Sequence, residues 1–176
     1  MWYTSGEKKA LDFIKNMNKY NKRLGYHALM TPHMMVHTCP WCSTGEIERN
    51  CIQSQGTIYC APPVKSALTG NEALRLGLTE ICIYNVYKEK NETQKWWDYM
   101  DAAYDCQASR FSQECTGRAM MAAKIDLPKI QICLLNEADI MRSEHTLWQN
   151  SGIVYNPAIV INNHVYRVFS VLSNLL

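Results

Sequence analysis

The stretch NPAIVINNHVYRV, residues 156–168, gives the strongest indication of the fold of this chain. Two runs rich in β-branched residues, 158–161 and 165–168, predict two short β-strands. Asn162 and Asn163 stand between the runs, and asparagine tolerates the positive φ angles that a tight hairpin turn needs. The stretch therefore predicts a β-hairpin directly after Pro157, and the residues that follow it predict a terminal amphipathic helix.

The N-terminal part of the chain predicts a strand, a helix and a second strand. MWYTS (residues 1–5) is rich in β-formers, and the helix that follows it stops at Gly25. HALMTPHMMVHTC (residues 27–39) can fill a buried strand, although Pro32 forces an edge, a bulge or a break there. The apolar residues at helical spacing in the first helix are Phe13, Met17, Tyr20 and Leu24.

The middle of the chain predicts a block of helices. Ser112 and Asp126 can each cap a helix, and Pro128 is tolerated in the first turn of the second one. Residues 137–150 predict a further helix that stops at Gly152. Two other helices are indicated by apolar residues at helical spacing, which are Leu74, Leu78, Cys82 and Val86 in one and Trp97, Met100 and Tyr104 in the other.

Composition and charge are those of an ordinary globular protein. The 176 residues suffice for one domain with its own core, and 47% of them are hydrophobic against 19% charged. A formal net charge of +2 is too small to argue for nucleic acid as a partner. No apolar run reaches the length of a membrane span, and residues 1–9 lack the apolar region of a signal peptide.

The cysteine content indicates an oxidising compartment. Eight cysteines, an even number, favour disulfides over free cytosolic thiols. Asn91 begins the sequon Asn91-Glu92-Thr93 in a polar stretch and is a candidate glycosylation site. A luminal chain without a signal peptide is expected to be a piece of a longer precursor, in which Met1 would be internal. The candidate disulfide cysteines are Cys39, Cys42, Cys51, Cys60, Cys82, Cys106, Cys115 and Cys133.

The order of these elements is that of an α/β thioredoxin-like fold with a helical insertion. The hairpin segment resembles the cis-proline strand and hairpin of the DsbA-like branch of that fold, and the resemblance implies a cis peptide bond at Pro157. A longer ordered set of motifs is similar to the central luminal domain of plant vacuolar sorting receptors. Those motifs are Thr31-Pro32-His33, Tyr59-Cys60-Ala61-Pro62, Trp96-Trp97-Asp98-Tyr99, Glu114-Cys115 followed by Ile125-Asp126, and the Pro157 hairpin.

The resemblance covers nearly the whole chain and implies a single thioredoxin-like domain over residues 1–176. Its parts would be strand, helix and strand in residues 1–38, a disulfide-stapled loop in 39–68, the helical insertion in 69–152, and the cis-proline hairpin with the terminal helix in 153–176. In those receptors the domain lies between a protease-associated domain and growth-factor-like repeats, ahead of a single membrane span.

The segment TCPWC, residues 38–42, has the spacing of a thiol–disulfide oxidoreductase and also of half a zinc site. Thioredoxin-type chemistry needs its cysteine pair after the first strand, where the N-terminus of the first helix lowers the thiol pKa. That junction is Thr4-Ser5-Gly6-Glu7-Lys8-Lys9, which contains no cysteine. We therefore expect no catalytic residue, and we expect structural disulfides that join Cys39 and Cys42 to different partners and Cys106 to Cys115.

A redox-active pair is the first alternative. If residues 1–5 were an extension outside the fold, Cys39 and Cys42 would lie beside Pro157, as in DsbA-like or lysosomal thiol-reductase enzymes. Residues 43–51 argue against this alternative because they lack the apolar period of the long helix that must follow an active-site pair. An exposed dithiol among six other cysteines would also risk scrambling.

A zinc site is the second alternative for the same segment. His33 and His37 are four residues apart and would point to one face of a strand, close to Cys39 and Cys42. The spacing is nonstandard and an oxidising lumen favours disulfides, so we expect no metal and no other cofactor.

These observations predict a non-catalytic, protein-binding domain of a receptor-like protein. It would bind a protein or peptide ligand, or support a neighbouring cargo-binding domain, in the lumen of the Golgi, endosome or vacuole or at the cell surface. The alternatives are a structural subunit of an extracellular or luminal assembly and a thiol–disulfide oxidoreductase that uses Cys39 and Cys42.

Overall fold

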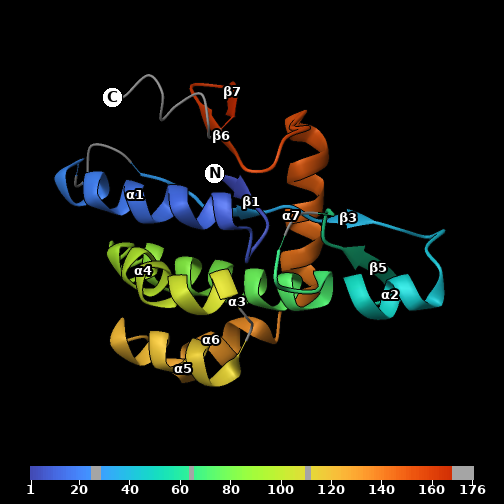
Figure 1. Cartoon of the computed structure of the whole chain (residues 1–176), viewed down its shortest axis with the longest axis horizontal. Helices are drawn as coiled ribbons and strands as arrows, with labels where there is room; N and C mark the ends of the chain where they lie inside the picture. The colour runs from blue at the N-terminus through green and yellow to red at the C-terminus, as the bar shows by residue number, and fades with distance from the viewer. Residues whose placement is uncertain (25–28, 64–65, 110–111, 168–176) are drawn as a thin grey trace.

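Two small sheets and a set of helices build the molecule (Figure 1). The computed structural model describes residues 1–24, 29–63, 66–109 and 112–167, and within them it contains seven strands and seven helices. Their order is β1 (Trp2–Tyr3), α1 (Lys8–Leu24), β2 (His33–Met34), β3 (His37–Thr38), α2 (Thr44–Asn50), β4 (Cys51–Ser54), β5 (Thr57–Cys60), α3 (Gly70–Lys88), α4 (Gln94–Ser109), α5 (Gln113–Ala122), α6 (Leu127–Leu134), α7 (Glu137–Ser151), β6 (Ala158–Ile161) and β7 (His164–Arg167).

The opening residues form a central strand of the four-stranded sheet, as the sequence predicts. The strand order is β2-β1-β6-β7, with β1 parallel to β2 and antiparallel to β6. Trp2 lies opposite His33 on one side and Ala158 on the other. The side chains of Trp2 and Tyr3 are buried, so β1 belongs to the core.

The β-hairpin predicted after Pro157 is present. Strand β6 pairs antiparallel with β7, and Asn162 and Asn163 turn the chain with φ angles of 48° and 64°. The Asn156–Pro157 peptide bond is cis, the conformation that the resemblance implies. The second strand begins one residue earlier than expected, at His164, and the expected terminal helix lies in residues 168–176, outside the described residues.

The single strand predicted over residues 27–39 is in fact two strands in two different sheets. Strand β2 starts directly after Pro32 and is an edge strand, a position that tolerates the missing N–H of proline. Strand β3 leaves that sheet and pairs with β5, which in turn pairs with β4. His33 and His37 therefore lie in different sheets.

The helical block follows the predicted caps. The Thr69 side chain accepts a hydrogen bond from the Glu72 N–H, and the Glu72 carboxylate accepts one from the Thr69 N–H at 2.8 Å, so a capping box starts α3. Ser112 caps α5 and Asp126 stands at the N-cap of α6. Helix α7 ends at Gly152, whose φ of 64° suits a glycine C-cap.

The core lies between stacked helices. Figure 1 shows α1 above α3 and α4, with α5 and α6 on the opposite side of these two helices. Trp96 and Trp97 are buried, and the largest other fully buried side chains include Tyr3, Tyr84 and Tyr99. No helix among the described residues is long and apolar enough to span a membrane.

Candidate functional site

The candidate site is the β1–α1 corner, defined here as residues 4–7, where a thioredoxin-type enzyme would carry its cysteines. The Glu7 N–H donates to the Thr4 carbonyl at 3.1 Å, and the Leu11 N–H donates to the Glu7 carbonyl at 3.0 Å, which starts α1. The Asn156 amide donates to the Thr4 hydroxyl oxygen at 2.5 Å. The corner therefore lies against the residue that precedes the cis proline, as the resemblance implies.

Beneath the corner, the Ser5 hydroxyl is hydrogen-bonded to a buried carboxyl group. The hydroxyl groups of Tyr3 and Ser5 donate to Glu80 Oε2 at 2.8 and 2.6 Å, and the Gln107 amide donates to Glu80 Oε1 at 2.8 Å. Glu80 is fully buried, and this burial raises the pKa of its carboxyl to about 7 despite the three hydrogen bonds that lower it. Ser5 is buried as well, so its hydroxyl supports the core and is not accessible as a nucleophile.

Above the corner, a cavity of about 590 Å³ opens between α1, α7 and the cis-proline loop. Its walls combine apolar side chains with a few polar groups, as in many ligand pockets. Among the described residues, three of its lining side chains have a buried polar atom without a hydrogen-bond partner: Glu7 Oε2, Trp148 Nε1 and Asn156 Oδ1. The remaining lining residues are Lys8, Lys9, Asp12, Met35, Pro62, Pro63, Val154 and Tyr155.

These three groups determine what the cavity can bind. Glu7 is only 7% exposed, and burial raises the pKa of its carboxyl to about 7 although Lys9 lowers it. The residues of the cavity wall thus include two buried hydrogen-bond acceptors and one buried donor without a partner among the described residues, the kinds of group that an amide-bearing ligand such as a peptide could engage. Trp148 is half-buried and lines the cavity.

The cysteines correct one expectation. Cys39 and Cys42 are bonded to each other, so the prediction that they have different partners is wrong. The physical reason is a tight turn, in which the Cys42 N–H donates to the Cys39 carbonyl at 3.4 Å and the two Cα atoms lie 5.5 Å apart. The other bonds are Cys51–Cys60, Cys82–Cys133 and Cys106–Cys115, the last of which is the pair expected from its short spacing.

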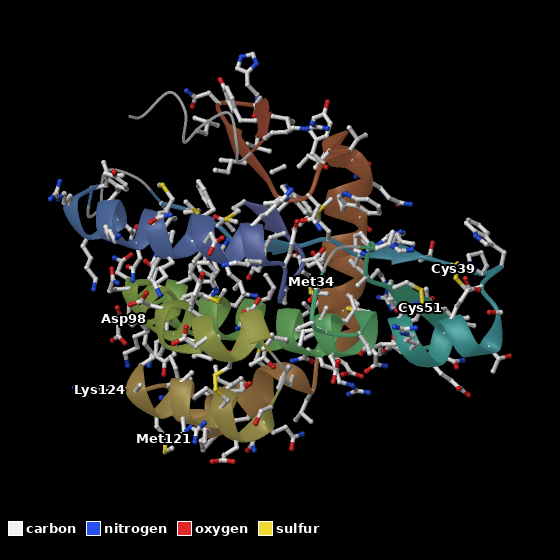
Figure 2. All side chains as sticks on the ribbon, in the orientation of Figure 1. Met34, Cys39, Cys51, Asp98, Met121 and Lys124 are labelled. Carbon is white, nitrogen blue, oxygen red and sulfur yellow. A yellow bond between two sulfur atoms is a disulfide. The ribbon has the colours of Figure 1, made fainter. Side chains whose placement is uncertain are left out.

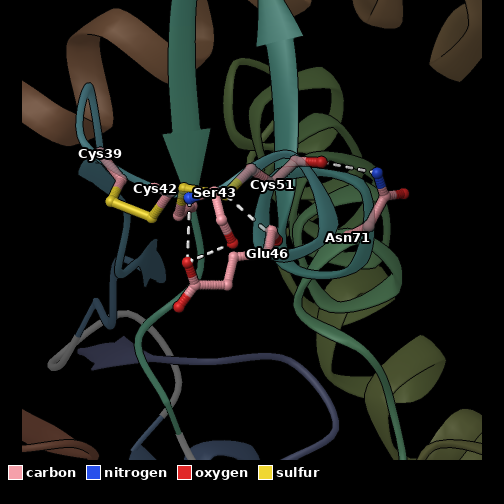
Figure 3. The surroundings of a disulfide bond; sticks show 7 residues. Cys39, Cys42, Ser43, Glu46, Cys51 and Asn71 are labelled. Carbon is pink, nitrogen blue, oxygen red and sulfur yellow. Dashed lines mark hydrogen bonds between the residues drawn. A yellow bond between two sulfur atoms is a disulfide. The ribbon is translucent and has the colours of Figure 1, made fainter.

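A short helix that the sequence reasoning missed follows the CPWC segment (Figure 3). Helix α2 has a capping box, because the Ser43 N–H and hydroxyl both donate to Glu46 at 2.9 and 2.7 Å. The Ser43-to-Glu46 spacing is the signal that could have revealed it. The helix has seven residues and buries none of them, so it is not the long core helix of a redox enzyme. The pair follows β3 of the three-stranded sheet, whereas Pro157 precedes β6 of the other sheet.

The four residues of the zinc alternative are not assembled. His33 stacks on Trp2 with ring centroids 4.6 Å apart, and its Nδ1 lies 3.3 Å from the buried Glu144 carboxylate. His37 lies near Trp148, and burial lowers the pKa of its imidazole. Within the part of the chain that the structure describes, only the sulfurs of Cys42, Cys51 and Cys60 form a cluster of metal-ligand type, and all three are in disulfides.

The sequon asparagine is exposed. Asn91 lies in the turn between α3 and α4 with a φ of 57°, where a glycan would not displace packed side chains. Glycosylation at Asn91 stays a prediction.

Comparison with known proteins gives the family. The profile described as vacuolar sorting receptor thioredoxin-like domain matches residues 2–173. The chain is 28% identical over 179 residues to vacuolar-sorting receptor 6 and 30% identical over 179 residues to vacuolar-sorting receptor 5, both of Arabidopsis thaliana. These matches cover 90% of this chain but 28% and 29% of the two receptors. Vacuolar-sorting receptor 1 of Pisum sativum is 25% identical over 177 residues, covering 89% of this chain and 28% of that receptor.

The chain therefore spans less than a third of the length of the curated relatives it matches. The family profile, by contrast, extends over nearly all of the chain. This chain belongs to the vacuolar sorting receptor thioredoxin-like domain family.

Proposed function

We propose that this chain is a non-catalytic luminal domain of a vacuolar-sorting-receptor-like protein, which binds a protein ligand or supports a neighbouring cargo-binding domain. The observation that carries the proposal is the β1–α1 corner, where residues 4–7 contain no cysteine and Ser5 is held by buried Glu80. Thiol–disulfide exchange at this place would need a thiolate beside the cis proline. The names of the relatives describe sorting receptors and support a receptor role over an enzyme.

The cavity above the corner supports a peptide as the ligand. A peptide backbone supplies both N–H and C=O groups, which match the acceptors of Glu7 and Asn156 and the donor of Trp148. The apolar walls, which include Met35, would receive a ligand side chain. Four disulfides support a location in the oxidising lumen of the secretory pathway or at the cell surface.

A domain exchange tests the receptor role. Residues 1–176 would replace the matching domain of Arabidopsis vacuolar-sorting receptor 5, and the readout is secretion of a soluble vacuolar protein from cells that depend on that receptor. We expect the chimera to retain the vacuolar protein. Secretion at the level of a receptor from which the domain is deleted would overturn the proposal.

Variants of the chimera separate ligand binding from structural support. Val154→Asp places a charge at the exposed wall of the cavity and should cause secretion if the cavity binds cargo. Leu135→Asp makes the same change at an exposed position after α6 that is not part of the cavity lining, and should leave sorting intact. Equal sorting by both variants would assign the domain to the supporting role.

An enzyme assay tests the competing oxidoreductase function, which the Cys39–Cys42 disulfide favours. Insulin reduction with glutathione as the reductant should proceed no faster with the native chain than with the Cys42→Ser variant. A rate that is clearly higher for the native chain would reject the non-catalytic assignment.

A further inference from the structure

Two of the four disulfides lie close together. The sulfur atoms of Cys42, Cys51 and Cys60 all lie within 4.8 Å of one another, yet Cys42 is bonded to Cys39 while the other two are bonded to each other. We call these three sulfurs together with Cys39 the sulfur cluster (Figure 3). Among the described residues, no sulfur of the other two disulfides belongs to a comparable cluster.

The strand register creates this proximity. Cys60 pairs with Cys51 across β4 and β5, and on its other side it pairs with His37 of β3. The chain passes from β3 into the tight turn that ends at Cys42, which brings the Cys42 sulfur back over the Cys51–Cys60 bond. The proximity is therefore a consequence of the sheet and not of a flexible side chain.

The cluster is reachable from solvent on one side. Cys42 is half-buried, whereas Cys39, Cys51 and Cys60 are buried, and Trp41 in the same turn is 80% exposed. Cys42, Cys51 and Cys60 also line an open cavity of about 390 Å³. A small thiol in this cavity would meet the Cys42 sulfur first.

We propose that the sulfur cluster is an intramolecular thiol–disulfide exchange site, in which reduction of the Cys39–Cys42 bond is passed on to the Cys51–Cys60 bond. An external thiolate attacks the Cys42 sulfur, forms a mixed disulfide and releases Cys39 as a thiolate. A second external thiolate attacks the external sulfur of this mixed disulfide, so that the external thiols leave as their own disulfide and Cys42 becomes a thiolate. The two external thiols have then supplied the two electrons that reduced the Cys39–Cys42 bond.

The following step needs no further reductant. The Cys42 thiolate attacks the sulfur of Cys51 or Cys60, a bond from Cys42 to that sulfur forms, the Cys51–Cys60 bond breaks, and the other cysteine leaves as a thiolate. This step leaves the number of disulfides in the partly reduced chain unchanged and alters only their pairing. This property is independent of the proposed receptor role, which requires no change in the disulfides.

The exchange would affect the β4–β5 hairpin, which is hydrogen-bonded to helix α3. The Cys51 carbonyl accepts a hydrogen bond at 2.6 Å from the Asn71 side chain, in the first turn of α3 (Figure 3). Figure 2 shows Cys39 and Cys51 at the end of the molecule opposite to Asp98 and Lys124, so the exchange is confined to one end of the fold. A new pairing would change how β4 and β5 are fixed, while the disulfides of the helical block stay as they are.

The Cys39→Ser variant of the full chain tests the proposal, because it leaves Cys42 without its partner. After incubation at pH 8, free thiols are blocked with N-ethylmaleimide and the disulfides are mapped by mass spectrometry of non-reduced peptides. If the three pairings are equally stable, about a third of the label is expected on each of Cys42, Cys51 and Cys60. Less than about a twentieth of the label on Cys51 and Cys60 together after several hours would overturn the proposal, since exchange between neighbouring sulfurs takes seconds to hours.

The matched control is Cys106→Ser, which also breaks one disulfide and leaves Cys115 unpaired. Its label should stay on Cys115, with the other three disulfides intact. Label spread over the helical disulfides in the Cys39→Ser variant would also overturn the proposal, because it would indicate general scrambling of an unfolded chain.

A second measurement uses the native chain and does not depend on whether a variant folds. Partial reduction with glutathione should give molecules that carry label on Cys39 together with either Cys51 or Cys60, while Cys42 remains in a disulfide. Partly reduced molecules with label only on Cys39 and Cys42 would overturn the proposal.

Discussion

The buried carboxyl group of Glu80 should make the stability of this domain depend on pH in a way that one substitution removes. Glu80 is fully buried, and its pKa is raised from the ordinary 4.5 to about 7, mainly by desolvation. Between these two values the unfolded chain has lost the proton while the folded chain keeps it. The free energy of unfolding therefore falls as the pH rises from about 4.5 through 7, and the loss is complete above that range.

The size of the effect follows from the two pKa values. One pKa unit corresponds to about 1.4 kcal/mol, so the raised pKa of Glu80 lowers the free energy of unfolding by about 2.5 kcal/mol between pH 5 and pH 8. Glu80→Gln keeps the shape of the side chain but does not titrate. Its amide oxygen can accept from Tyr3 and Ser5, and its NH2 group can donate to Gln107 Oε1 once the Gln107 amide, whose nitrogen now donates to Glu80, turns over.

The assay is urea unfolding with disulfides intact, followed by the fluorescence of buried Trp96 and Trp97, at several pH values and constant ionic strength. We expect the stability of the Gln variant relative to the native chain to rise by about 2.5 kcal/mol between pH 5 and pH 8. Glu7, whose pKa is also raised to about 7, is present in both proteins and cancels in this difference. Glu89→Gln, at the exposed end of α3, controls for the exchange of a carboxylate for an amide. A relative stability that changes by less than about 1 kcal/mol over this range would refute the reasoning.

Three further predictions test the fold. Gly6→Ala should lower the free energy of unfolding by about 2 kcal/mol, because Gly6 has a φ of 78° and an added Cβ would lie 2.5 Å from Leu68. Gly45→Ala in α2 is the control, since its added Cβ meets no atom within 4 Å and should be neutral or stabilising. Urea unfolding measures both. Replacing both cysteines of the Cys82–Cys133 bond by alanine should lower the free energy of unfolding by about 4 kcal/mol, and the same replacement at Cys106–Cys115 should lower it by about 2.6 kcal/mol. The difference arises because the first bond joins cysteines 51 residues apart and the second joins cysteines 9 residues apart. Equal losses in thermal or urea unfolding would contradict the loop-entropy argument. Thr69→Ala should cost about 1 kcal/mol by removing the N-cap of α3, and an unchanged urea midpoint would show that this cap contributes nothing.

The parts of the fold that could be predicted from the sequence are those fixed by neighbouring residues. Asn162 and Asn163 determine the hairpin turn, and Ser112 caps α5, because each acts on backbone within a few positions of itself. Asp126 stands at the N-cap of α6 without a capping hydrogen bond from its side chain. Helix α2 shows the limit of apolar periodicity as a signal. It buries none of its residues, so only its capping box marks it.

The parts that could not be predicted depend on contacts between distant segments. The separation of His33 and His37 into two sheets follows from the pairing of β2 with β1 and of β3 with β5, which a local pattern does not encode. Eight cysteines allow 105 pairings, and the Cys39–Cys42 bond results from the turn between them, whose geometry their spacing alone does not fix. The cavity above the corner is likewise assembled from four segments of the chain.

A thioredoxin-type enzyme has its cis proline and its cysteine pair in one site, whereas in this chain the cis proline belongs to the corner and the cysteine pair to the sulfur cluster. The corner has the cis proline and a cavity but no sulfur, and the sulfur cluster has the thiol chemistry but lies in the other sheet. Of the residues that line the two cavities in the described part of the chain, only Pro62 and Pro63 are common to both. The two cavities therefore adjoin at these prolines, and Thr4 of the corner lines the cavity that contains Cys42, so a mixed disulfide at Cys42 would form next to the place where a peptide would lie. Because Val154 lines only the first cavity and Cys42 only the second, substitutions at these two positions should affect ligand binding and disulfide exchange separately.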